Sequence, residues 1–211
     1  MILTRYCLYF ILLSSGLWTH NLLAVGVSPV RVVIPTNQNS GVLILQNETD
    51  QTRTYSIKPY SWTIKEGTGE TEMARTKNIL SSIPVIRIPS GETYTSRIMI
   101  INRGSAAQDT YRLIIADITP KKPNTEAVDV DLSVKQISIP VFVYNKNDVK
   151  GNLSIEKDNR IKNTGELVLR VTQWIDQQGQ EQKDLVYLFP GHLSTFTVKN
   201  LSSVTYTDVM H

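Results

Sequence analysis

The chain has 211 residues, of which 41% are hydrophobic and 19% charged, and its formal net charge at pH 7 is +3. A balance this close to neutral argues against nucleic acid or a membrane surface as the main partner. The single cysteine, Cys7, lies close to the N-terminus. The rest of the chain therefore has no disulfide, no thiol nucleophile and no cysteine-based zinc site.

Residues 1–24 have the layout of a secretory signal peptide. Arg5 supplies a positive charge, an apolar stretch runs from Tyr6 to Trp18, and Ala24 offers a small residue for cleavage. The apolar stretch is shorter than the roughly 20 residues that a spanning helix needs, although an uncleaved membrane anchor is the alternative. We expect export and cleavage near Ala24, which leaves about 190 residues.

The body of the chain is predicted to be all-β. Segments rich in Val, Ile, Thr and Tyr alternate with turn-forming residues, and no long stretch has a helical period. Short strands at regular intervals predict immunoglobulin-like β-sandwiches. The predicted strands are Ser40–Leu45, Thr54–Thr63, Thr93–Ile101, Tyr111–Thr119 and Val128–Val143.

A run of alternating residues opens the last of these strands. Val128, Val130, Leu132 and Val134 alternate with polar residues after a loop rich in Lys, Pro and Asn, so a strand would carry these four aliphatic side chains on one face. Such a strand is often a sheet edge that can pair with another protein. An ordinary half-buried strand is the alternative.

A weak internal repeat indicates two domains. The first half has Asn47, then Trp62, then a Pro-Ser-Gly turn that ends at Gly91, and the second half has Asn163, then Trp174, then a Pro-Gly turn at residues 190–191. We therefore predict an N-terminal domain over residues 25–145 and a smaller C-terminal domain over residues 146–211, joined by a polar segment.

An enzymatic function is not expected. Outside the leader only two histidines remain, and neither is spaced as in a metal-binding helix motif. The sequence has no Gly-x-Ser-x-Gly elbow and no phosphate-binding loop. We expect no catalytic residue, no metal, no cofactor and no small-molecule substrate.

The order and spacing of several segments resemble the pilus-assembly chaperones of the chaperone–usher pathway. The segments that carry the resemblance are Val27–Ile34, Ile79–Pro84, Ile88–Gly91, Thr110–Pro120, Ile137–Val143, Asn163–Gly165 and Phe189–Gly191. The sequence Ser-Ile-Pro-Val-Phe within Ile137–Val143 is most similar to the archaic branch of that family.

The resemblance implies donor-strand complementation. A pilin subunit is an incomplete immunoglobulin fold, and the chaperone lends it a strand whose alternate side chains fill a groove. Val128, Val130, Leu132 and Val134 are the predicted donor side chains. Ile137 and Ile139 have the opposite parity, so either a bulge near Lys135 and Gln136 shifts the face or this second set packs in the chaperone's own core. Val141 and Val143 are expected in the core.

The resemblance also implies that two basic residues grip the subunit's C-terminal carboxylate. Arg31 matches the family's arginine, and a guanidinium can bond both carboxylate oxygens. Pro140 stands where classical members have a lysine, so another cation must replace it. Arg112 is the first candidate, and Arg97 and Lys150 come after it.

The resemblance implies pilin subunits and an outer-membrane usher as partners. The same edge-strand argument predicts that the free protein self-associates by capping its exposed strand. The alternative function, from a different class, is an exported adhesion or structural fimbrial module made of tandem immunoglobulin-like domains.

Overall fold

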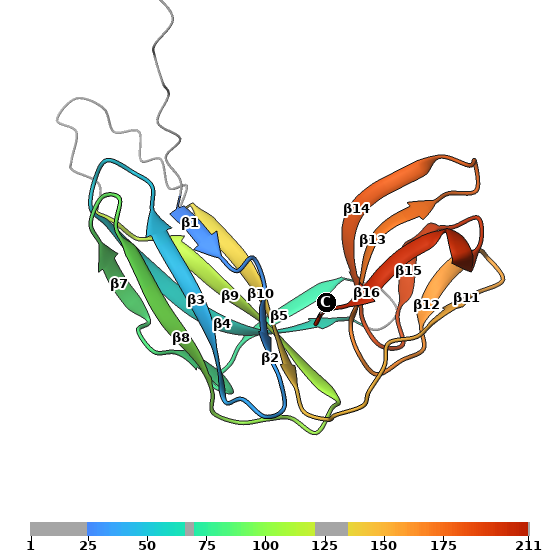
Figure 1. The fold of residues 1–211 in the computed structure, drawn as a ribbon, viewed down its shortest axis with the longest axis horizontal. Coiled ribbons are helices and arrows are strands. Elements are labelled where there is room, and N and C mark those ends of the chain that lie inside the picture. The colour runs from blue at the N-terminus through green and yellow to red at the C-terminus, as the bar shows by residue number, and fades with distance from the viewer. Residues whose placement is uncertain (1–24, 66–69, 121–134, 211) are drawn as a thin grey trace, which may run out of the picture.

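The structure, a computed structural model, describes residues 25–65, 70–120 and 135–210. The chain forms two β lobes with an open angle between them (Figure 1). The described residues contain no α-helix, and their one helical turn is the 3₁₀ turn Leu201–Ser203. The predicted all-β fold is confirmed. In these ranges no helix has the length and apolar character to cross a membrane.

Two sheets form the N-terminal lobe. One sheet has the order β1 (Val25–Ser28), β3 (Ser40–Asn47), β8 (Thr93–Ile100), β6 (Ile79–Ser81). The other has the order β2 (Val32–Ile34), β10 (Gln136–Tyr144), β9 (Gln108–Asp117), β4 (Arg53–Ile64), β5 (Thr71–Arg75), with β7 (Val85–Ile88) also paired to β4. In the text below, the second sheet is called the β10 sheet.

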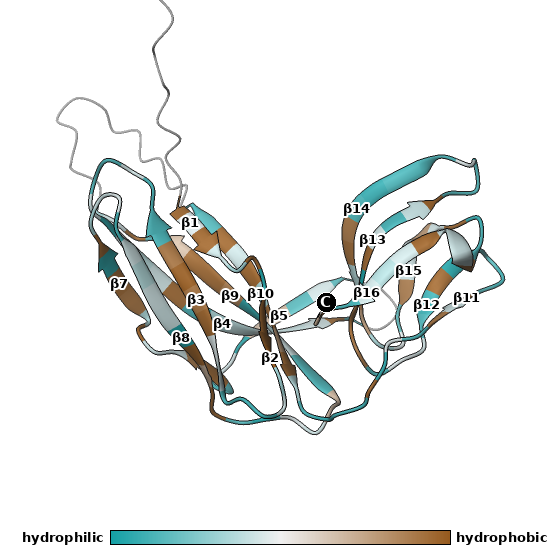
Figure 2. Ribbon diagram, viewed as in Figure 1, coloured by the Kyte–Doolittle hydropathy of each residue, from teal (hydrophilic) through white to brown (hydrophobic). Residues whose placement is uncertain are grey.

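The alternation of buried and exposed positions along each strand explains how the two sheets pack. In β3 the side chains of Leu43 and Leu45 are fully buried, whereas Val42 and Ile44 between them are exposed. The core between the sheets also includes Leu113 of β9 and, as predicted, Val141 and Val143 of β10. Figure 2 shows apolar residues, in brown, along these strands. Because successive side chains of a strand point to opposite faces, only every second one of them enters the core.

The opening segment, Val27–Ile34, does not run as a single strand. It forms two strands, because β1 pairs antiparallel with β3 while β2 pairs parallel with β10 in the other sheet. Pro29 lies at the crossing, and a proline has no backbone N–H to continue a ladder. The chain therefore leaves one sheet there and enters the other.

The C-terminal lobe is a smaller sandwich. Its sheets are β11 (Leu153–Ile155), β12 (Arg160–Asn163), β15 (Leu193–Thr197) and β14 (Glu181–Leu188), β13 (Leu169–Ile175), β16 (Val204–Asp208). Its core includes Ile161 and Val171, both fully buried, and Trp174, whose ring stacks on Phe196 with 3.8 Å between the centroids. Residues 145–152, which include the predicted domain boundary, connect β10 to β11.

A separate apolar cluster joins the lobes. Its buried members are Trp62, Ala107, Phe142, Tyr144, Leu167, Val168, Phe189 and Val209. The first four come from the N-terminal lobe and the others from the C-terminal lobe. One buried hydrogen bond crosses the same contact, from the backbone N–H of Val168 to Oε1 of Gln108, at 3.0 Å. The lobes therefore pack on each other through apolar side chains as well as being linked by the chain.

Candidate functional site

The outer face of the β10 sheet, which faces away from the N-terminal core, carries a row of cationic side chains. Arg112 of β9 lies opposite Pro140 of β10 on one side and opposite Tyr60 of β4 on the other. Tyr60 in turn lies opposite Arg75 of β5. Arg31 directly precedes β2, whose first residue, Val32, lies opposite Val141; the same register extended by one residue puts Arg31 beside Pro140. Directly opposed residues of neighbouring strands share a face, so these side chains form one row across the sheet.

The register gives Pro140 a clear position within this row. The proline stands between Arg112 of β9 and Arg31, which precedes β2, so the two predicted anchor residues flank the position at which the resemblance implies a lysine. A proline ring carries no charge. The arrangement brings together the two residues that the sequence predicted as anchors.

Arg112 is half-buried against an aromatic surface. Its guanidinium carbon lies 3.8 Å from the centroid of the Trp62 ring, which is a close cation–π contact. Its Nη1 lies 3.4 Å from the hydroxyl of Ser138 on β10. Burial lowers the pKa of Arg112, and the nearby Tyr187 acts in the opposite direction. Arginine stays protonated under all physiological conditions, so this half-buried group is a permanent positive charge.

Of the other candidate cations, only Arg31 lies beside the row. Arg31 is half-buried beside the start of β2. Arg97 is exposed on β8, which belongs to the opposite sheet, and Lys150 is exposed in the segment between the lobes. Arg75 stacks over Tyr60, with 5.4 Å from its guanidinium carbon to the ring centroid. The row therefore has Arg75 as a third cation, which sequence reasoning missed.

The structure describes only two of the six predicted donor residues, Ile137 and Ile139. Val128, Val130, Leu132 and Val134 lie outside the described residues. Ile139 is buried in the N-terminal core, and Ile137 is half-buried against the same core. Of the two alternatives for Ile137 and Ile139, their packing favours the core.

The aromatic residues around Arg112 could not be found from the sequence. Trp62 contacts Tyr187 of β14 edge-on, with 5.4 Å between ring centroids and an angle of 89°, and it contacts Phe189 at 4.8 Å and 81°. Trp62 stood out only as part of the internal repeat. Nothing in the spacing of Tyr187, which is 125 residues from Trp62 in sequence, marked it as a neighbour.

The described residues show no sign of metal chemistry. Within residues 25–65, 70–120 and 135–210, no group of three or more His, Cys, Asp or Glu is placed to hold an ion. An open pocket of about 400 Å³ lies at the junction of the lobes, between Pro35, Tyr144, Asn147 and Asp208. None of the three arginines of the row lines it, so the pocket and the cationic row are separate features.

Comparison with known proteins places this architecture in a family. Residues 24–147 match the family described as pili and flagellar-assembly chaperone, PapD N-terminal domain. No curated protein matches the chain. The match covers the lobe that carries the cationic row.

Solved structures share the fold at low sequence identity. The complex of the chaperone CsuC with the tip subunit CsuE, from archaic Csu pili of Acinetobacter baumannii, matches at 17% identity and TM-score 0.59, covering 83% of this chain and 90% of that chain. The SafA pilin complex with the SafB chaperone of Salmonella enterica matches at 13% and 0.65, covering 84% and 85%. The periplasmic chaperone SfaE matches at 14% and 0.63, covering 88% and 93%.

The family match spans more than half of the chain, and the fold of both lobes agrees with it. A pilus-assembly chaperone was the function predicted from the order of the sequence motifs, and the alternative of an adhesion module is not needed to explain them. The chain belongs to the family of pili and flagellar-assembly chaperones, which is not a family of enzymes.

Proposed function

We propose that this chaperone acts in the periplasm, where it binds pilin subunits by donor-strand complementation and anchors their C-terminal carboxylate on Arg31 and Arg112. The observation that supports the proposal is the register of the β10 sheet, in which Arg112 lies opposite Pro140 and Arg31 is the residue just before the strand β2 on the other side of β10. A proline at the position of the family's lysine would otherwise leave a single cation for the carboxylate.

The chemistry of the row suits a carboxylate. Each guanidinium can donate two parallel N–H bonds to the two oxygens, and such charge-assisted bonds contribute roughly 1.5–3 kcal/mol. Stacking on Trp62 occupies one face of the Arg112 guanidinium, whereas its N–H donors lie in the guanidinium plane at the edge. Arg112 therefore keeps hydrogen-bonding capacity while its position is restricted.

Four of the predicted donor residues and the residues of the anchor region on β10 have even sequence numbers, which would put them on the same face of a regular strand. Val128, Val130, Leu132 and Val134 have the same parity as Pro140 and Phe142, whose side chains belong to the outer face. A strand without a bulge would give all of them to one face. Each aliphatic side chain that a subunit buries contributes roughly 1.5–3 kcal/mol. The anchor would then fix the register of a subunit strand along these side chains.

The anchor is tested by recovery of a pilin subunit. Candidate subunits are co-expressed with the wild type, with Arg31→Ala and with Arg112→Ala, and the soluble complex is quantified. We expect each variant to weaken the complex by roughly tenfold to hundredfold, from the loss of one charge-assisted interaction. Arg31→Lys and Arg112→Lys should restore only part of the binding, because an ammonium lacks the two-point fork.

Arg97→Ala is the matched control, since Arg97 is an exposed cation of the same lobe on the opposite sheet. Its complex should equal that of the wild type. Unchanged recovery with both Arg31→Ala and Arg112→Ala would overturn the carboxylate anchor.

The donor face is tested by changing Val130 and Leu132 together to Asp. We expect the double variant to fold, as judged by circular dichroism, but not to keep subunits soluble, because a carboxylate cannot enter an apolar groove. Loss of folding in the free double variant would assign these two residues to the chaperone's core.

Delivery to an outer-membrane usher, self-association of the free protein and membership of the archaic branch remain proposals. The similarity to a complex from archaic Csu pili supports the last of these. Export rests on the leader at residues 1–24, and N-terminal sequencing of the periplasmic protein would show whether cleavage occurs near Ala24. Sedimentation analysis of the free protein, with and without the Val130 and Leu132 changes, tests self-association.

A further inference from the structure

The C-terminal lobe reaches the anchor region through aromatic side chains. Trp62 of the N-terminal lobe carries Arg112 on its ring, and the same ring contacts Tyr187 and Phe189 of the C-terminal lobe. Tyr187 also lies against Phe142 of β10, with 5.5 Å between centroids and an angle of 42°. These rings make a continuous link from β14 to the guanidinium of Arg112.

The link restricts Arg112 in a way that its own strand does not. An arginine on an outer sheet face ordinarily has many rotamers, and ordering it on a ligand costs entropy. Here the indole supports the guanidinium and the edge-on rings of Tyr187 and Phe189 hold the indole. The second lobe thus helps to hold the anchor in one position before a ligand arrives.

Tyr187 also brings a hydroxyl group close to Arg112. It is half-buried near the end of β14, and it is close enough to Arg112 to act on the pKa of that guanidinium. A tyrosine hydroxyl can donate a hydrogen bond. A carboxylate that takes two N–H bonds from one guanidinium still has lone pairs for a further donor.

We propose that Tyr187 is a residue of the carboxylate site supplied by the C-terminal lobe, its O–H donating to the carboxylate that Arg112 binds, while Trp62 is the positioning residue for Arg112. The inference rests on the proposed function and deepens it. Both lobes then contribute to the anchor, so the lobes must keep their relative position for the anchor to work.

The test uses a pair of synthetic peptides of alternating valine and threonine, one with a free C-terminal carboxylate and one with a C-terminal amide. Affinities for the intact chaperone are measured by fluorescence anisotropy, and the ratio between the two peptides reports the anchor alone. Tyr187→Phe keeps the ring and removes only the hydroxyl. We expect it to lower the preference for the free acid by about threefold to tenfold while leaving amide binding unchanged.

Two further variants separate the roles. Trp62→Leu removes the stacking surface but no charge, and it should also lower the preference for the acid, whereas Arg112→Ala should abolish it. Tyr206→Phe is the matched control, because Tyr206 is exposed on β16, and it should leave both affinities as in the wild type.

The outcomes distinguish this inference from the proposed function. An unchanged ratio in Tyr187→Phe, together with a lost preference in Arg112→Ala, would overturn the role of Tyr187 and leave the anchor intact. Equal binding of the two peptides by the wild type, or an unchanged ratio in Arg112→Ala, would overturn the carboxylate anchor and the role of Tyr187 with it.

Discussion

The two lobes each hold one strand-end turn with a fully buried asparagine, Asn47 in the N-terminal lobe and Asn163 in the C-terminal lobe. The main-chain bonds correspond: Gly91 N–H donates to the carbonyl of Asn47 at 2.9 Å, and Gly191 N–H donates to that of Asn163 at 2.8 Å. The side-chain amides correspond as well. Each amide donates to the carbonyl three residues before that glycine, which belongs to Ile88 at 2.9 Å in the first lobe and to Leu188 at 2.8 Å in the second.

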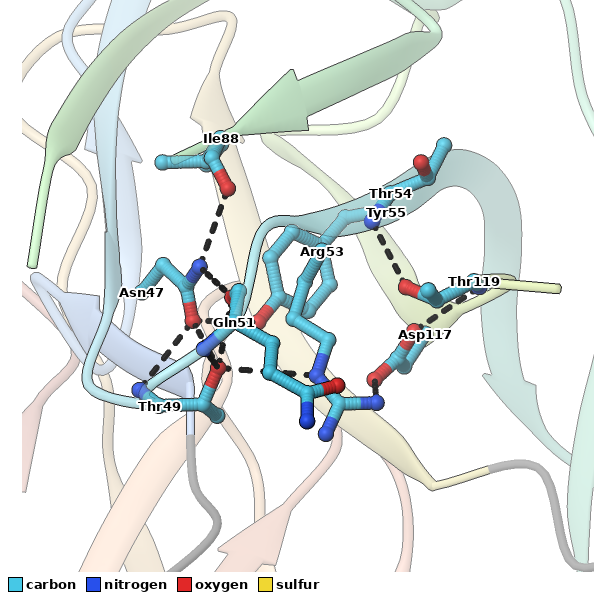
Figure 3. Close-up of polar contacts among 9 residues, drawn as sticks. All are labelled: Asn47, Thr49, Gln51, Arg53, Thr54, Tyr55, Ile88, Asp117 and Thr119. Atoms are coloured by element: carbon cyan, nitrogen blue, oxygen red, sulfur yellow. Dashed lines mark hydrogen bonds and ion pairs between the residues drawn. The ribbon is translucent and has the colours of Figure 1, made fainter. Parts of the chain in front are cut away.

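The lobes differ two residues after the asparagine. Thr49 donates both its N–H and its hydroxyl to Oδ1 of Asn47, and its hydroxyl also lies 3.5 Å from Nε of Arg53. Arg53 forms an ion pair of 3.6 Å with Asp117 at the end of β9 (Figure 3). The corresponding residue of the second lobe, Gly165, has only its N–H to donate to Asn163.

The difference has a steric cause. A Cβ at Gly165 would lie 2.6 Å from the backbone nitrogen of Asn152 and 2.7 Å from the carbonyl oxygen of Lys150. The chain that connects the lobes passes where a threonine side chain would stand. In the second lobe, a glycine at this position allows the interlobe segment to pack closely, and the extended polar network is absent there. In the first lobe, the network connects the turn to the end of β9.

The strongest test of this comparison exchanges the two residues. Gly165→Thr should destabilise the C-terminal lobe by more than about 3 kcal/mol, because backbone atoms cannot move aside as a side chain can. Thr49→Gly, the reciprocal change, should cost only about 1–2 kcal/mol from lost hydrogen bonds. Hydrogen exchange measured peptide by peptide assigns each loss to its lobe. Equal losses for both changes would contradict the steric explanation.

A second test replaces the asparagines themselves. Asn47→Ala leaves several buried backbone groups without partners, and we expect a loss of about 3–5 kcal/mol in the N-terminal lobe. Asn163→Ala should cost less, about 2–4 kcal/mol, because its side chain serves fewer partners. Urea unfolding combined with hydrogen exchange measures both. A larger loss for Asn163→Ala would show that the extended network does not stabilise the first lobe.

The smallest expected effect is a change in the stability of the C-terminal lobe at low pH. The backbone N–H of Gln180, followed by the side-chain amide of Gln182, lowers the pKa of Asp176 in the turn between β13 and β14. A carboxyl whose pKa is lower in the folded state contributes stability above its unfolded pKa, about 3.9, and this contribution is lost as the pH falls through the folded value.

Asp176→Asn should therefore lower stability slightly at pH 7, and the difference from the wild type should disappear at about pH 2. Urea midpoints across this pH range check the prediction. Asp184→Asn, another exposed carboxyl of the same lobe, is the control. A difference that grows in acid would have the wrong sign and would exclude the turn as its origin.

Much of this protein follows from local sequence patterns. The expectation that Val141 and Val143 of β10 lie in the core was correct, because each residue's face is set by its own strand. The repeat around Asn47 and Asn163 marked two equivalent turns, since the same hydrogen bonds need the same residue at the same spacing. The order and spacing of the sequence motifs correctly predicted the family of pilus-assembly chaperones.

Other features depended on contacts between distant segments. The row of Arg31, Pro140 and Arg112 exists only because β2 and β9 both pair with β10 in one register. The support of Arg112 by Trp62 and Tyr187 needs two lobes packed at a particular angle. Local residue preferences determine which face of a strand is apolar, but register and interlobe packing are set by the sum of many long-range contacts. For that reason the sequence alone could propose Arg31 and Arg112 as anchor residues but could not predict the surface around them.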